Sequence, residues 1–146
     1  MGTTTGRKTS TGSILLITRL ARQIYRRSTD ELLGIPLTDL AVLNLLRDHE
    51  RAHGPMPQQT LNEQLCLHAN AGVLALNKLE AAGYVERRRD PADRRRHMVA
   101  LTPDGREVLA RAEHGQASIE DDILAGLDAE QRHQLQLLLQ RALDQL

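Results

Sequence analysis

The chain has 146 residues, of which 40% are apolar and 26% are charged, and this balance suits one compact domain or a small domain with a helical extension. Tyr25 and Tyr84 are its only aromatic side chains, so we expect a core of Leu, Ala, Val and Ile and no aromatic-lined cofactor pocket. The formal charge of zero is divided unevenly, because residues 1–28 carry six Lys or Arg and no acid, whereas residues 104–146 carry nine acids and four Arg.

The N-terminal segment contains an arm and a helix. Residues 1–12 are rich in Gly, Thr and Ser and have no apolar period, which is typical of a flexible arm. From residue 13, apolar residues recur at helical spacing, and the pattern ends at Gly34 with Pro36 beyond it. We therefore predict one helix over residues 13–34.

The next segment predicts a second helix. Thr38 can cap it, and the apolar residues at 40, 43 and 46 share one face. Polar residues that include His49 and His53 follow, and Gly54 comes directly after them, so we interpret this stretch as a loop.

Two further helices lie close together in the sequence. Pro57 suits the first position of the shorter one. The other runs from about His68 to Ala82, and Gly83 can end it in a left-handed turn. Only a few residues around Cys66 separate these helices, a spacing that suits a helix-turn-helix.

An arginine-rich hairpin is predicted next. Residues 84–89 and 97–101 are short extended runs, and the Pro and Asp residues of Asp90–Asp93 mark the turn between them. Six arginines within ten residues would repel one another unless they are solvated or paired with anions. A solvated charge run is the simpler interpretation, but the position beside a helix-turn-helix favours contact with DNA.

Two helices complete the chain. Thr102 and Pro103 provide a cap and a first helical position for a long helix that Gly126 ends. Asp128 and Gln131 form a capping-box-like start for the final helix, whose apolar residues recur at helical spacing.

These elements predict a mainly α fold with a small β-hairpin wing. We expect a winged helix-turn-helix domain over residues 35–102, with dimerisation helices over residues 13–34 and 103–146. Helices at both ends of a small DNA-binding unit have little to pack against within one subunit, whereas a homodimer would bury them and present two reading helices to a two-fold site. The second helix of such a motif fits the major groove, and the hairpin can reach a minor groove whose negative potential attracts Arg.

Three blocks of sequence, Leu79–Arg87, Asp90–Arg95 and Leu101–Gly105, occur in the order and spacing of the multiple antibiotic resistance regulator (MarR) family. The chain resembles that family from about residue 13 to residue 146. The resemblance implies that the helix before Gly83 reads DNA, that the hairpin is the wing, and that the first and last helices of two subunits interlock. It also implies a repressor that a small-molecule effector releases from a near-palindromic operator.

The predicted reading helix departs from the family pattern, which usually places Ser, Thr and Arg on its outward face. Asn70 is the best candidate for a base contact because Asn pairs well with adenine, while Val73 and Leu74 can meet thymine methyl groups. Lys78 can reach backbone phosphate. The candidate DNA-binding residues of this helix are His68, Ala69, Asn70, Val73, Leu74, Asn77 and Lys78.

The wing and the dimer have their own candidate residues. The family pattern implies that Asp93 orients the tip of the hairpin while Arg95, with Arg94, enters the groove. The candidate DNA-binding residues of the wing are Arg87, Arg88, Arg89, Asp93, Arg94, Arg95 and Arg96. The candidate dimerisation residues are Ile14, Ile17, Leu20, Ile24, Leu135, Leu138 and Leu139.

Other kinds of site are weakly indicated. His49 and His53 are one helical turn apart, but no second closely spaced ligand pair accompanies them, so we expect no metal. Cys66, the single cysteine, could be a redox switch, although a free cysteine at such a position is more often a small buried apolar residue. Without internal disulfides, a membrane span or signal peptide, or a nucleophile with a base, the chain is expected to be cytoplasmic, free of cofactors and not an enzyme.

The sequence supports two functions. The first is a transcriptional regulator that binds double-stranded DNA as a homodimer, and the basic wing favours it. The alternative is a helical dimeric ligand-binding or protein-interaction module with weak or non-specific affinity for DNA, and the apolar reading helix favours that one.

Overall fold

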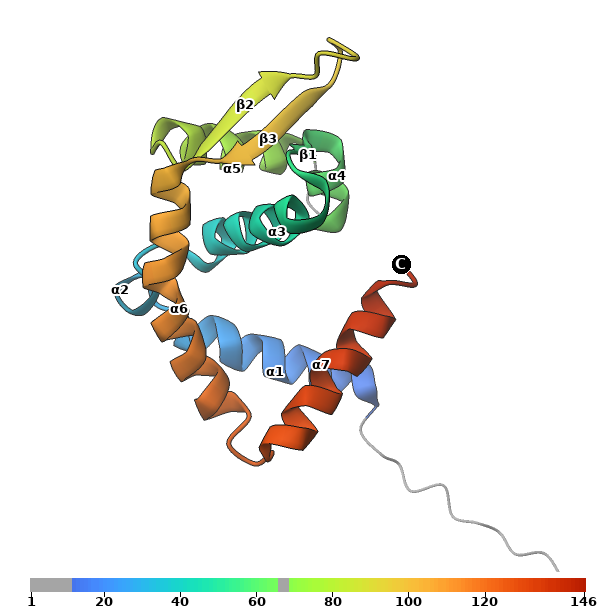
Figure 1. Cartoon of the computed structure of the whole chain (residues 1–146). Helices are drawn as coiled ribbons and strands as arrows, with labels where there is room; N and C mark the ends of the chain where they lie inside the picture. The colour runs from blue at the N-terminus through green and yellow to red at the C-terminus, as the bar shows by residue number, and fades with distance from the viewer. Residues whose placement is uncertain (1–11, 66–68) are drawn as a thin grey trace, which may run out of the picture. The chain divides into compact units, whose positions relative to one another are not determined.

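The computed structural model describes residues 12–65 and 69–146 (Figure 1). The chain divides into two compact units: Ser28–Ser118 forms one, and the chain up to Arg27 forms the other with Ile119–Leu146. None of the described helices is both long enough and apolar enough to cross a membrane.

The larger unit combines helices with a small antiparallel sheet. Its helices are α2 (Asp30–Leu33), α3 (Leu37–His53), α4 (Gln58–Gln64), α5 (Ala69–Ala81) and most of α6 (Pro103–Ile123). Its strands are β1 (Met56–Pro57), β2 (Val85–Arg89) and β3 (His97–Leu101), in the order β1-β3-β2. The predicted fold class, mainly α with a β-hairpin wing, is confirmed.

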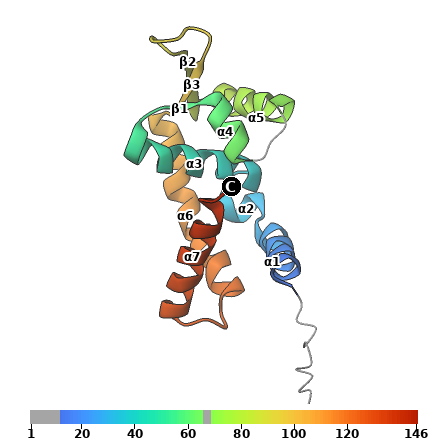
Figure 2. The ribbon, with the colours of Figure 1, turned by 90° about the vertical axis from the view of Figure 1, so that its right-hand side faces the viewer.

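The hairpin follows directly from α5. Gly83 has a φ of 81°, a left-handed conformation that favours glycine, and the Tyr84 N–H donates to the Leu79 carbonyl at 3.0 Å. This turn ends α5 and leads into β2. Val85 pairs with Leu101 and Arg89 with His97, so the two strands stay in register up to the turn. Figures 1 and 2 show that the hairpin projects from this unit beyond α5.

The core of the larger unit is aliphatic, as the sequence predicts. Leu40, Leu43 and Leu46 of α3 are fully buried, and Leu76 and Leu79 of α5 are 1% and 2% exposed. Val85, Val99 and Leu101 of the hairpin are also buried, so the base of the wing is part of this core. Burial of one such side chain contributes about 1.5–3 kcal/mol to stability, which fixes α5 and the wing on a common base.

The smaller unit contains α1 (Ser13–Arg27), the end of α6 and α7 (Ala129–Leu143). The predicted capping box is confirmed, because the Asp128 carboxylate accepts from the Gln131 N–H at 2.9 Å and the Gln131 side chain accepts from the Asp128 N–H at 3.0 Å. Arg132 then reaches back to Asp121 at 2.7 Å, which ties the start of α7 to α6.

The single helix predicted over residues 13–34 is wrong. The helix breaks after Arg27, and Thr29 adopts extended backbone angles while its hydroxyl accepts from the Leu32 N–H at 3.2 Å. Thr29 therefore caps a new short helix, α2, which Gly34 ends with a φ of 80°. Apolar spacing continues through the break, which is why periodicity alone did not reveal it.

Three smaller predictions also fail around α3. The helix begins at Leu37 without a side-chain cap, so Thr38 is not its cap. It continues to His53, so His49 and His53 lie on the helix and not in a loop, because no helix breaker occurs before Gly54. Pro57 lies in β1 and directly precedes α4, so it is not the first residue of that helix. Strand β1 itself was not predicted, since two residues carry no periodicity; Met56 pairs with Val99.

Candidate nucleic-acid interface

Helix α5 presents the face that the sequence predicts. Leu76 and Leu79 are buried, while Asn77 and Lys78 are exposed on the helix. Val73 and Leu74 are 39% and 69% exposed, so this face of α5 presents apolar side chains to solvent. His68 lies outside the described residues, and so do the side chains of Ala69 and Asn70.

Close packing fixes α5 against α4. Gly72 is buried on α5, and a β-carbon added there would overlap the Asn62 side chain of α4. A side chain at residue 72 would therefore require the Asn62 side chain to move. The turn between them, including Cys66, lies outside the described residues.

Lys78 has an acidic partner inside the unit. Its ammonium lies 2.8 Å from the carboxylate of Asp39, which is only 6% exposed at the start of α3. The hydrogen bond from Lys78 to Asp39, with the attraction between their charges, raises the pKa of the lysine. Lys78 remains largely exposed, so this contact leaves its expected role at a phosphate as a prediction.

Arg87 is engaged by α5 and does not project freely from the wing. Its guanidinium donates to Glu80 at 3.0 and 3.2 Å and to the Asn77 carbonyl oxygen at 2.6 Å. Hydrogen bonding to Arg87 lowers the pKa of Glu80, and the same bond raises the pKa of Arg87. The arginine run predicts a DNA contact for Arg87, and its partners could not be predicted because they lie on another element.

The tip of the wing is held by its own aspartates. Asp90 accepts from the Ala92 N–H at 2.9 Å, and Asp93 accepts from the Arg95 N–H at 3.0 Å. The Arg96 N–H also donates to the Asp93 carbonyl at 3.0 Å. These Asx-type contacts define the loop. The two carboxylates bind backbone N–H groups and not the neighbouring guanidinium groups.

Several wing arginines consequently keep their charge available. Within residues 12–65 and 69–146, the side chains of four exposed arginines form no ion pair or hydrogen bond. These four are Arg89, Arg94, Arg95 and Arg96. Arg88 pairs with Glu86 at 2.8 Å on the same strand and is also exposed. The tip is therefore the strongest concentration of unneutralised positive charge on the hairpin.

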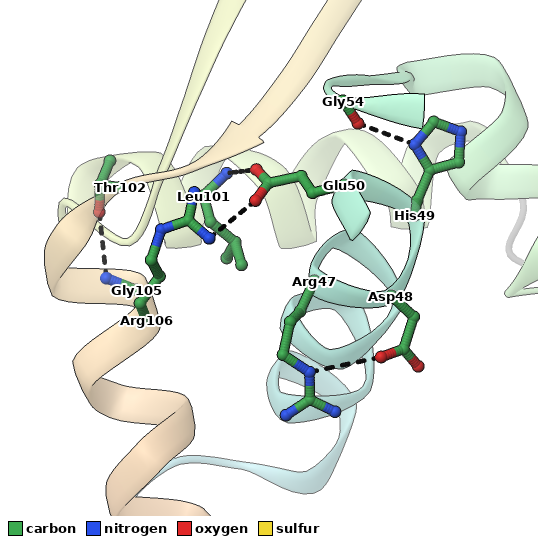
Figure 3. Close-up of polar contacts among 9 residues, drawn as sticks. All are labelled: Arg47, Asp48, His49, Glu50, Gly54, Leu101, Thr102, Gly105 and Arg106. Atoms are coloured by element: carbon green, nitrogen blue, oxygen red, sulfur yellow. Dashed lines mark hydrogen bonds and ion pairs between the residues drawn. The ribbon is translucent and has the colours of Figure 1, made fainter. Parts of the chain in front are cut away.

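Glu50 connects α3 to the base of the wing (Figure 3). One carboxylate oxygen accepts from the Leu101 N–H at 2.9 Å, and the other lies 2.8 Å from the Arg106 guanidinium. The Glu50 side chain is only 14% exposed. The sequence did not predict this contact, because a single glutamate on a helix carries no motif that reveals a partner 51 residues away.

A hollow of about 410 Å³ lies beside this contact, between α3 and α6. Its lining combines three arginines, two glutamates and a short apolar floor: Arg47, Glu50, Arg51, Arg106, Leu109, Ala110 and Glu113. The lining carries one more positive than negative charge, and Arg51 forms no ion pair with the described residues.

The histidine pair lies near the end of α3. His49 and His53 have ring centroids 5.1 Å apart, and the His49 Nδ1 lies 2.9 Å from the Gly54 carbonyl oxygen. In the part of the chain that the structure describes, no three His, Cys, Asp or Glu residues gather closely enough to hold a metal ion.

Comparisons with known proteins agree with this geometry. The sequence profile of the MarR family matches residues 35–97, which contain α3, the helix-turn-helix and the wing up to the start of β3. An uncharacterized HTH-type transcriptional regulator of Bacillus subtilis, YkoM, is 31% identical over 75% of this chain and 68% of its own length. The chain belongs to the MarR family.

Solved structures extend the likeness to nearly the whole chain. The PcaV transcriptional regulator of Streptomyces coelicolor, in complex with its natural ligand, is 26% identical with a TM-score of 0.71 over 92% of this chain and 93% of that chain. A MarR variant from Escherichia coli in complex with operator DNA has a TM-score of 0.71 over 88% of this chain and 91% of that chain at 23% identity, which shows a shared fold.

The family assignment defines the general role of the chain. It is a MarR-family transcriptional regulator with a DNA-binding fold, and the relatives that it matches are regulators, not enzymes. The chain spans 60% and 47% of the length of two further Bacillus subtilis relatives, YdgJ and YcgE.

Proposed function

We propose that this protein is a ligand-responsive repressor that binds a near-palindromic operator as a homodimer. The observation that carries the proposal is the joint placement, in one compact unit, of an exposed face on α5 and a hairpin tip with four unneutralised arginines. A helix of this kind fits the major groove, and arginines at such a tip suit the minor groove or the phosphates beside it.

Apolar contacts supply part of the sequence preference. Val73 and Leu74 offer the DNA methyl and methylene groups, whose natural counterpart in the major groove is the thymine methyl group. Asn70 remains our candidate for a hydrogen bond to adenine, and Ala69 and His68 for contacts beside it. Discrimination by so few polar groups is modest, and A·T base pairs are favoured.

A second copy of the chain is the proposed partner of α1 and α7. In the single chain Ile14, Ile17 and Leu138 are 80%, 53% and 61% exposed, and no residue of α1 or α7 is buried among the described residues. Monomeric proteins rarely expose apolar surface on this scale. A homodimer would cover the two helices and present two copies of α5 to the two halves of an operator.

The effector is proposed to be a small organic molecule. The hollow between α3 and α6 has the volume for one, and its excess positive charge with the floor of Leu109 and Ala110 suits an anion that has a short apolar body. The structure of PcaV with its natural ligand makes ligand binding a reasonable expectation for a relative.

One observation favours the alternative function. Within the described part of α5, the one lysine is paired with Asp39 and the outward amide oxygen of Asn77 is used by Arg87, so few polar groups remain for bases. A module with weak, non-specific affinity for DNA would have the same features.

Selection of bound fragments from genomic DNA separates the two functions. The purified full chain is mixed with fragmented genomic DNA, and the retained fragments are sequenced. Enrichment of a two-fold motif is expected for the regulator. Enrichment without a shared motif would support the alternative module.

A further inference from the structure

Two acidic side chains contact the wing from different helices. Glu80 of α5 accepts from the backbone N–H of Arg87 at 3.2 Å, in addition to the guanidinium contacts described above. Glu50 of α3 accepts from the backbone N–H of Leu101 at 2.9 Å. Each strand of the hairpin is therefore bonded to one carboxylate.

The sheet topology explains why these N–H groups are available. In the order β1-β3-β2, strand β2 lies at the edge, so an N–H on its outer side has no partner strand. Strand β1 pairs with β3 only at Val99 and Met98, so β3 is uncovered on that side at Leu101. An unpaired N–H near the core is costly, and each carboxylate takes the place of a missing strand.

Both carboxylates are also joined to an arginine. Arg87 forms a fork with Glu80 and a third contact with Asn77, and its side chain is 22% exposed. Arg106, in the first turns of α6, pairs with Glu50 (Figure 3). Charge-assisted and forked contacts of this kind hold direction as well as distance.

We propose that Glu80 and Glu50 are positioning residues that hold the wing at a fixed angle to α5, and that Arg87 belongs to this clamp and not to the set of DNA contacts. The proposal rests on the DNA-binding function proposed above and specifies how the wing is oriented for it. The proposal predicts the opposite change in DNA affinity from the one that simple electrostatics predicts. A carboxylate beside a DNA-binding surface repels phosphate, so its neutralisation should strengthen binding, whereas loss of a clamp should weaken it.

Glu86 provides a matched control. It lies on β2, carries the same charge and pairs with the exposed Arg88 at 2.8 Å, and among the described residues its carboxylate forms no hydrogen bond or ion pair with another element. Glu86→Gln removes a negative charge from the wing and releases Arg88 without disturbing the clamp. It should leave DNA affinity unchanged or increase it.

The test measures the Kd for the selected operator by fluorescence anisotropy at several salt concentrations, using the full chain. Glu80→Gln should weaken binding on the order of tenfold, the size expected for losing a charge-assisted hydrogen bond. Arg87→Ala should weaken binding similarly without flattening the salt dependence, and the double variant should be no weaker than Arg87→Ala. Unchanged or tighter binding by Glu80→Gln, or a slope reduced by about one in Arg87→Ala, overturns the proposal.

Amide hydrogen exchange without DNA gives an independent readout. Glu80→Gln should increase exchange at the Arg87 amide, and Glu50→Gln at the Leu101 amide, while Glu86→Gln changes neither. Equal protection at the Arg87 amide in the wild type and in Glu80→Gln overturns the clamp. If the wild type shows no preference for any DNA sequence, the proposed function fails, and the exchange result alone then decides the clamp. Glu80 is the main target because it is more exposed than Glu50, so its loss threatens folding less.

Discussion

At the tip of the wing, backbone N–H groups occupy the carboxylates of Asp90 and Asp93, and the neighbouring guanidinium groups have no acidic partner in the described part of the chain. Arg87 lies on β2, before the tip, and its guanidinium is instead hydrogen-bonded to Glu80 and Asn77. Within ten positions, arginine side chains therefore occur both with and without partners among the described residues. The sequence predicted a basic hairpin but could not separate these two groups of arginines, because the partners of Arg87 belong to α5.

Arg95 is the best wing residue for a test of DNA contact. Arg95→Ala, and to a lesser degree Arg94→Ala, should weaken DNA binding by on the order of 1–3 kcal/mol, because each removes a charge that has no partner among the residues that the structure describes. Folding should be nearly unaffected, since an exposed tip contributes little to the core. Loss of one phosphate contact should also reduce the salt slope by about one. Unchanged affinity in both variants would mean that the tip is only solvated.

Asn70 carries the prediction on base preference. Asn70→Ala should relax preference at one operator position by roughly 1–3 kcal/mol if its bond to adenine is bidentate. Lys78→Ala should instead weaken binding to all sequences about equally, because a lysine there reaches only backbone phosphate. Binding to the operator and to its single-base variants distinguishes the two effects. If Asn70→Ala leaves the base preference unchanged, Asn70 does not read the base, and specificity comes from DNA shape or from the wing.

At the scale of elements, capping and turn chemistry were the most informative signals. Gly83 ends α5 with a positive φ, and Asp128 with Gln131 begins α7, both as predicted. The break at Thr29 was missed because apolar spacing runs through it, and β1 was missed because two residues show no pattern. Local signals thus define most helix and strand boundaries, whereas the other boundaries depend on contacts between residues that are distant in the sequence.

Gly105 joins the first turn of α6 to the base of the wing. A β-carbon there would overlap the Tyr84 carbonyl oxygen, which also accepts from the Thr102 N–H at 3.1 Å. Gly105→Ala should therefore lower the free energy of unfolding by about 1–3 kcal/mol, because backbone cannot move aside as a flexible side chain does. Gly126→Ala is the control, since nothing lies within 4 Å of the added carbon. Equal midpoints of urea unfolding in the two variants would show that α6 shifts to accommodate the added carbon without a loss of stability.

At the scale of the molecule, α1 and α7 expose apolar side chains that a single chain leaves uncovered. The sequence predicted their apolar periodicity and the candidates Ile14, Ile17, Leu20, Ile24, Leu135, Leu138 and Leu139. All of these except the half-buried Leu135 are exposed in the single chain. The sequence did not single out Leu15, Leu137 or Leu143, which are also exposed, because periodicity cannot tell a face that packs within the chain from one that meets a partner.

Substitution on these helices tests the homodimer. Ile17→Glu or Leu138→Glu should convert a dimer into a monomer at micromolar concentration, because truncation alone of such a side chain costs roughly 2–5 kcal/mol when it is buried. Light scattering reports the mass. Leu74→Glu, on the exposed face of α5, should remain dimeric. A wild-type protein that is already a stable monomer would contradict the proposed assembly.

The ratio of two dissociation constants tests the central claim most directly. The Kd of the wild-type protein is measured on the operator recovered by genomic selection and on a scrambled duplex of equal length and composition, at one physiological salt concentration. A sequence-specific regulator with few polar base contacts should prefer the operator by on the order of 10³, near the lower end for specific DNA-binding proteins. Equal affinity for the two duplexes would contradict the account and leave a non-specific DNA-binding module.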